Sequence, residues 1–149
     1  GGSTLALLQG MCFLLLAPVA GVPLSFSAVL AVIAVMALVA FALTSVGLTI
    51  AWRMDSVQGF HAVMNLILMP IWFLSGAFFP ATGLPSWLGW LMRLNPLTYG
   101  MAALRNCFYL GNPTVVGPLP SMLPSLVVLV VFAGGSFLLA TMTAQRKAE

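Results

Sequence analysis

"FFPATGLPSWLGWLMRLNPLTYGMAALR", residues 78–105, interrupts a chain that otherwise consists mainly of long apolar runs. The stretch combines prolines and glycines, which break helices, with tryptophans and arginines, which favour membrane surfaces. Between Ser86 and Leu94 the tryptophans and leucines recur at helical offsets, and Arg93 lies on the opposite face. Because an indole ring prefers the headgroup level of a bilayer, we expect a short helix here that lies in the membrane interface.

A second helix is expected to begin directly afterwards, at Asn95-Pro96. Asparagine is a favoured N-cap, and proline suits the first helical position, where its missing N–H has no partner to lose. The residues that follow carry an apolar stripe of Leu97, Met101, Leu104 and Phe108. Residues 80–112 are therefore expected to form a two-helix extracellular cap, which from these residues alone could simply shield the helices below it.

The composition excludes a water-soluble globular domain. Of the 149 residues, 62% are hydrophobic and 5% are charged, whereas a soluble domain carries about a quarter charged residues. All the charged residues lie outside the long apolar runs, as expected if those runs occupy hydrocarbon. The net charge of +3 comes from scattered cations that form no basic stripe, so we expect no nucleic-acid partner.

Four segments are long and apolar enough to cross a bilayer, which takes about 20 residues. They cover about residues 4–20, 27–52, 59–79 and 122–142. Small residues recur along the second segment and favour close helix packing. We therefore expect an all-α, polytopic membrane protein with four transmembrane helices, forming a single transmembrane domain over residues 1–149.

The arginines and lysine indicate an orientation. Two predicted spans separate Arg53 from Arg146 and Lys147, so these three cations share one side, and Arg93 and Arg105 lie on the other. Since cytoplasmic loops carry an excess of Lys and Arg, we expect both termini in the cytoplasm and a multi-pass protein of the inner membrane.

The third segment has a polar face. At 100° per residue, His61, Asn65 and Ser75 fall on the same side, together with Leu68 and Trp72. Polar side chains within a membrane tend to face the bundle interior or a wet cavity. This face is expected to look inward, either as a lining or as an interhelical hydrogen-bond seam without a ligand, and Pro70 is expected to kink the helix.

The chain offers little catalytic chemistry. One histidine and two acids give no metal-ligand spacing with Cys12 or Cys107, and the lone Lys147 precedes alanine, so a phosphate-binding Lys-Ser/Thr loop is absent from the sequence. We expect no catalytic site, metal site or cofactor in this chain. Energy for any uphill transport would then come from a partner.

Residues 52–110 resemble the C-terminal half of the permease subunit of type-2 ABC exporters, the family of daunorubicin-resistance and nodulation lipo-oligosaccharide exporters. The resemblance rests on the order and spacing of six short elements. These are Arg53 with Gln58-Gly59-Phe60, Met64-Asn65, the run from Phe73 to Pro80, Leu84-Pro85, Leu94-Asn95-Pro96-Leu97-Thr98-Tyr99, and Arg105.

The resemblance implies a bacterial six-helix permease of which this chain supplies the third to sixth helices, without the two preceding spans and the amphipathic helix before them. It also implies a homo- or heterodimer of permeases in membrane lipid, and a separate ABC ATPase subunit that uses ATP and Mg²⁺. The substrate would be an amphiphilic drug-like molecule, a lipid or a glycolipid, as in multidrug efflux. The alternatives are a non-transport assembly or anchoring module, and half of an ion-driven carrier.

The resemblance further implies roles for individual residues. The substrate pathway would be lined by Asn65, Leu68, Trp72 and Ser75 of the third span. The extracellular gate would lie in the two cap helices and include Trp87, Trp90, Asn95, Pro96, Tyr99 and Arg105. His61 receives no role.

Overall fold

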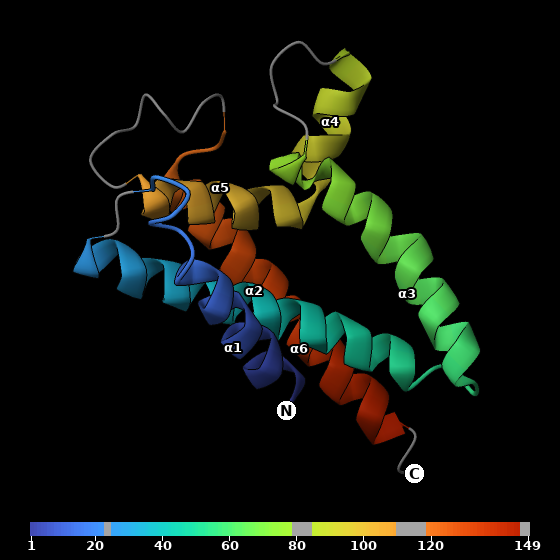
Figure 1. Cartoon of the computed structure of the whole chain (residues 1–149). Helices are drawn as coiled ribbons and strands as arrows, with labels where there is room; N and C mark the ends of the chain where they lie inside the picture. Colours follow the sequence, from blue (N-terminus) through green and yellow to red (C-terminus); the bar gives the residue numbers. More distant parts are fainter. Residues whose placement is uncertain (23–24, 79–84, 110–118, 147–149) are drawn as a thin grey trace.

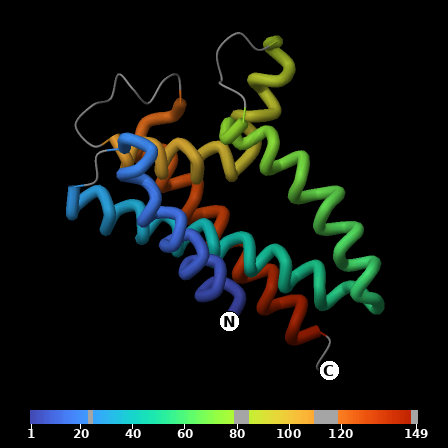
Figure 2. Tube along the Cα trace, viewed as in Figure 1, coloured from blue at the N-terminus to red at the C-terminus, as the bar shows by residue number. Residues whose placement is uncertain are grey.

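The computed structural model describes residues 1–22, 25–78, 85–109 and 119–146, and every regular element within them is helical. Figure 1 shows the arrangement, and Figure 2 traces the same view as a tube. The elements are α1 (Gly2–Leu14), α2 (Phe26–Ala51), α3 (Val57–Trp72), the π-helix η1 (Phe73–Ala77), α4 (Ser86–Leu94), α5 (Pro96–Phe108) and α6 (Met122–Arg146). The all-α prediction is therefore confirmed, and the bounds of both cap helices match the predicted ones.

The two long helices α2 and α6 form the most extensive contact in the molecule (Figure 1). Their buried faces are rich in small residues, including Ala42 and Ser45 of α2 and Ala133 and Ser136 of α6. Small side chains let two helix backbones approach closely, which favours association within lipid. The two serine hydroxyls donate to carbonyls of their own helices, Ser45 to Phe41 and Ser136 to Phe132, so they add no unpaired polar group to the contact.

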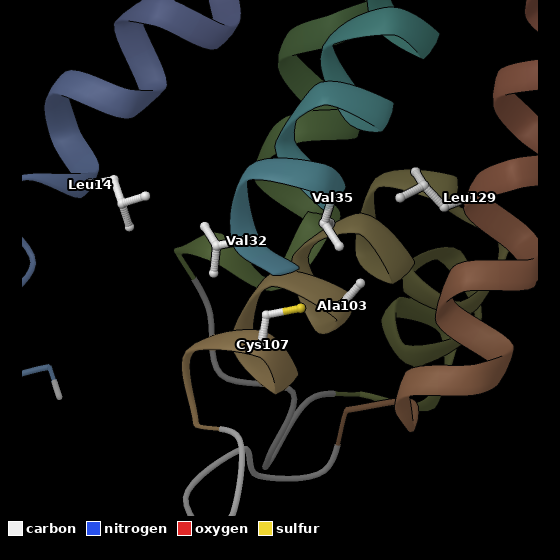
Figure 3. Close-up of a cluster of buried hydrophobic side chains, with 6 residues drawn as sticks. All are labelled: Leu14, Val32, Val35, Ala103, Cys107 and Leu129. Atoms are coloured by element: carbon white, nitrogen blue, oxygen red, sulfur yellow. The ribbon is translucent and has the colours of Figure 1, made fainter. Parts of the chain in front are cut away.

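The apolar core lies where α5 crosses α2 and α6 (Figure 3). It contains Leu14, Val32, Val35, Ala103, Cys107 and Leu129. Gly100 permits this crossing, because a Cβ at its position would lie 3.1 Å from Cγ2 of Val39 and 3.7 Å from Cδ1 of Leu129. The helix α5 is thus packed into the bundle on several sides, rather than resting on it by one apolar stripe.

Among the described residues, three helical segments are long and apolar enough to span a membrane: Phe26–Ala51, Val57–Ala77 and Met122–Arg146. The first predicted span along the chain, residues 4–20, contains a regular α-helix only as far as Leu14. Hydrogen-bonded turns continue from there to Gly21, whose positive φ of 75° ends the segment. The N–H groups of Gly21 and Val22 bond the carbonyls of Pro18 and Ala17, the pattern of a Schellman helix end. Since Pro18 has no N–H, it cannot continue the α-helical ladder.

The α-helix α3 continues past Pro70 and ends at Trp72. The next five residues form the π-helix η1, and Gly76, with a φ of 82°, breaks the helical conformation. No residue of α3 is buried. This helix therefore stands away from the α2–α6 pair along much of its length, in contrast to α5.

The α2–α3 turn and the C-terminal end of α6 lie at the same end of the molecule (Figure 1). Arg53 and Arg146 line a common pocket there. Their location on one side of a membrane stays a prediction, and Lys147 lies outside the described residues.

Candidate functional site

A groove of about 460 Å³ lies between α3 and the α2–α5 pair. Its lining residues are Leu43 of α2, Met64, Asn65, Leu68, Met69 and Trp72 of α3, and Leu97 of α5. Asn65 is the one polar side chain in this set, so the groove is an apolar surface with a single amide. Such a surface suits a ligand that is largely hydrocarbon and carries few polar groups.

Three of the four predicted pathway residues come together in this groove. Asn65, Leu68 and Trp72 are spaced by three and four positions, so the α-helical period places them on one face. That face is turned toward α2 and α5, as the prediction of an inward-looking face requires.

Ser75, the fourth predicted residue, is absent from the groove lining. It is 3% exposed, and its hydroxyl donates a hydrogen bond of 2.6 Å to the carbonyl of Trp72. The prediction extended a period of 100° per residue past Trp72, where the chain instead forms a π-helix. A π-helical turn contains more residues than an α-helical turn, so the side chains beyond Trp72 point in other directions than the period predicts.

Three aromatic rings gather where α3 passes into η1. The ring centroid of Trp72 lies 5.6 Å from that of Phe73 and 4.6 Å from that of Phe78, and the last two lie 5.3 Å apart. The Trp72–Phe78 pair meets edge to face, a favourable arrangement of two ring quadrupoles. All three side chains remain exposed. They extend the apolar surface of the groove toward η1.

Side chains along α5, from its N-cap to its last turn, hold the end of the α3–η1 segment. Asn95 Nδ2 donates to the carbonyl of Ile71 at 2.6 Å, and Thr98 Oγ1 donates to that of Leu74 at 3.3 Å. Arg105 donates through its guanidinium to the carbonyl of Gly76 at 2.9 Å. The last carbonyls of a helix lack partners within the helix, and a cation near them is favourable. We call this set of three hydrogen bonds the α5–η1 junction.

Asn95 serves the junction and its own helix at once. Its Oδ1 accepts a hydrogen bond of 3.0 Å from the backbone N–H of Leu97, which makes it the N-cap of α5. Pro96 occupies the first helical position, as predicted. Because Leu97 lines the groove, the residue that ties α5 to the end of α3 also positions part of the groove wall.

The remaining predicted gate residues fall into two groups. Tyr99 donates from its hydroxyl to the carbonyl of Arg93 at 2.9 Å and so connects α5 to α4. Trp87 and Trp90 project from α4, each 64% exposed. The guanidinium of Arg93 lies 6.0 Å from the ring centroid of Trp90. Within the described residues, α4 makes only limited contact with η1 and α5, so it stands out from the bundle (Figure 1).

Thr98 is the residue that the sequence interpretation missed. It lay off the predicted apolar stripe of α5, yet it is buried at the junction. Its spacing of seven from Arg105 places both side chains on one helix face, and that spacing is the signal that identifies the pair.

Within the part of the chain that the structure describes, no acidic, basic, His, Cys or Tyr side chain lines the groove. His61 is exposed, and its ring meets that of Phe60 edge-on at 5.5 Å. Among the described residues, no group of three or more His, Cys, Asp or Glu side chains gathers in a metal-binding arrangement. Cys12 and Cys107 are free thiols, and burial raises the pKa of Cys107.

Comparison with known proteins gives one match. The family model described as ABC-2 type transporter matches residues 1–109, a range that includes every groove-lining residue and the whole α5–η1 junction. No curated protein and no solved structure matches the chain.

Proposed function

Since the chain belongs to the ABC-2 type transporter family, we propose that it moves an amphiphilic drug-like, lipid or glycolipid molecule outward across the membrane. The family makes the chain a permease component of an ABC transporter. The direction of transport and the class of substrate are the proposal.

The observation that carries the proposal is the groove along α3. A largely apolar wall with the single amide of Asn65 favours a molecule with a long hydrocarbon part and a polar group that can hydrogen-bond. A strongly charged substrate would find no counter-charge among the lining residues and would lose hydration without compensation. The exposed ring of Trp72 offers the largest apolar contact in the groove.

The α5–η1 junction is proposed as the gate at one end of this path. Leu97 and Asn95 are separated by one residue, so a displacement of the start of α5 would move the groove wall and the hydrogen bond to Ile71 together. Closure of a partner ATPase around ATP and Mg²⁺ would supply the force, and the exposed tryptophans of α4 would keep the lid at the extracellular interface.

The proposed assembly has two permeases and two ATPase subunits in the bacterial inner membrane, with both ends of this chain in the cytoplasm. In this assembly α1 and the turns to Gly21 provide a fourth pass, and the four passes are the third to sixth of a six-helix permease. The shared position of Arg53 and Arg146 supports this orientation.

The test is ATP-dependent substrate uptake into inverted vesicles that contain the permease and its co-expressed ATPase. Trp72→Ala removes the largest apolar contact in the groove, so the apparent affinity for an amphiphile is expected to fall about tenfold, given the transfer energy of a large apolar side chain. Leu66→Ala is the matched control, because Leu66 lies on the same helix, is 77% exposed and does not line the groove.

Equal effects of the two substitutions on uptake would contradict the pathway assignment. ATP-independent uptake driven by an ion gradient would contradict the proposal that the protein works with an ATPase. Uptake that requires ATP and is weakened only by Trp72→Ala is the expected result.

A further inference from the structure

The end of the molecule opposite α4 carries two neighbouring pockets that share the same cations. One, of about 390 Å³, is lined by Trp52, Arg53, Asp55, Thr143 and Arg146. The other, of about 240 Å³, is lined by Arg53, Leu139, Met142, Thr143 and Arg146. Arg53 and Arg146 come from the α2–α3 turn and from the last turn of α6, so the fold brings together two arginines that are far apart in the sequence.

The two pockets share Arg53, Thr143 and Arg146 and differ in the residues that each adds. The first adds Trp52 and Asp55. The second adds Leu139 and Met142, which lie farther from the end of α6 and are exposed apolar side chains. Trp52 completes the wall of the first pocket, and tryptophan favours the level of lipid headgroups. A charged site thus continues directly into an apolar surface on a helix long enough to cross the membrane.

We propose that Arg53 and Arg146 bind the phosphate of an anionic phospholipid, with its acyl chains lying along Leu139 and Met142. Guanidinium groups pair with phosphate oxygens through two parallel hydrogen bonds, and basic pockets between membrane helices suit anionic headgroups. A free phosphate would use the arginines but not the apolar surface beside them. The lipid joins the α2–α3 turn to the end of α6, two segments that are far apart in the sequence and line the same pockets.

Asp55 weakens this site. Its carboxylate lines the same pocket as both arginines and competes with the phosphate for them. Asp55→Asn removes the competing negative charge while keeping the size of the side chain, so it should strengthen lipid binding. Because a misfolded variant would bind less lipid, stronger lipid binding by Asp55→Asn could not result from a loss of folding.

The experiment is native mass spectrometry of the purified protein equilibrated in detergent with equal amounts of phosphatidylglycerol and phosphatidylcholine. The unaltered protein is expected to retain phosphatidylglycerol preferentially. Retention should fall about fivefold for each arginine replaced in Arg53→Gln and Arg146→Gln, the effect of one cation at an anionic surface, and should rise in Asp55→Asn. Arg93→Gln is the control, since Arg93 lies on α4 at the other end of the molecule.

Two results would overturn the proposal. One is unchanged preference for phosphatidylglycerol in the variant with both Arg53→Gln and Arg146→Gln. The other is complete displacement of phosphatidylglycerol by inorganic phosphate at an ionic strength where chloride displaces none, which would identify a free-phosphate site instead. The control Arg93→Gln is expected to keep the preference of the unaltered protein.

Discussion

Asn95 connects three parts of the molecule through one side chain. It caps α5, ties that helix to the carbonyl of Ile71, and precedes the groove residue Leu97 by two positions. Asn95 is 7% exposed, so either hydrogen bond, once lost, would leave a buried polar group without a partner. Sequence reasoning identified the cap from the Asn-Pro pair but gave no sign of the bond to Ile71, because that partner lies in another helix.

Two substitutions at Asn95 separate its two roles. Asn95→Ser keeps a good N-cap but is too short to reach Ile71, so the free energy of unfolding should fall by about 1–2 kcal/mol. Asn95→Ala loses both bonds and should cost about 2–4 kcal/mol. Thermal or denaturant unfolding of the purified protein measures both. An unchanged free energy of unfolding in Asn95→Ser would show that the bond to Ile71 contributes nothing, and equal losses in the two variants would show that the N-cap contributes nothing.

At the scale of elements, the sequence predicted α4 and α5 well because their signals are local. The tryptophan and leucine spacing sets α4, and the Asn95-Pro96 pair sets the start of α5. The long apolar runs likewise predicted α2, the α3–η1 segment and α6.

The remaining differences depend on contacts and backbone geometry that periodicity does not contain. The switch to a π-helix after Trp72 turned Ser75 away from the groove. The break after Leu14 shortened the first regular helix, even though hydropathy continues beyond it. Thr98 and Arg105 lie off the predicted apolar stripe of α5, and they hold η1 because the carbonyls at the end of that segment need donors.

The close packing of α5 against α2 predicts a contrast between two helical glycines. Gly100→Leu places a side chain against Val39 and Leu129, and such overpacking costs about 1–3 kcal/mol. Gly89→Leu in α4 meets nothing within 4 Å at its Cβ and should stabilise its helix slightly.

The readout for this pair is the alkylation rate of Cys107 in a Cys12→Ser background. Cys107 lies near the end of α5 and is fully buried in the core, and its raised pKa keeps the thiol in its unreactive protonated form. Gly100→Leu should accelerate the reaction about tenfold or more, following the cost of overpacking, and Gly89→Leu should leave it unchanged. Identical rates would contradict the close α2–α5 packing.

At the scale of the whole molecule, the two ends have different chemistry. One end carries Arg53, Asp55 and Arg146, and the other carries the exposed tryptophans of α4. Between them, α1, α2, α5 and α6 pack together, while α3 is connected to the rest mainly through its two ends. One wall of the groove is therefore formed by α3, a helix that can shift relative to α2 and α5.

The proposed orientation predicts which residues react from each side of the membrane. Single cysteines at exposed Val57 and Gln145 should react with a membrane-impermeant maleimide only from the cytoplasmic side, and one at Ser86 only from the outside, in a Cys12→Ser background. Reaction of all three from the same side would contradict the placement of α4 and α5 as an extracellular lid.

If substrate passes along the groove, the distance between α3 and α2 must change during transport. Cross-linking a Leu43→Cys, Leu68→Cys pair across the groove with a bifunctional thiol reagent, in vesicles that contain the ATPase, tests it most directly. The control pair, Phe41→Cys with Phe137→Cys, joins α2 to α6, where the native rings lie 5.3 Å apart. The groove cross-link is expected to stop ATP-dependent uptake, and its removal by reduction is expected to restore uptake. The control cross-link should leave uptake intact. Full uptake with a completely cross-linked groove would contradict the groove as the transport path.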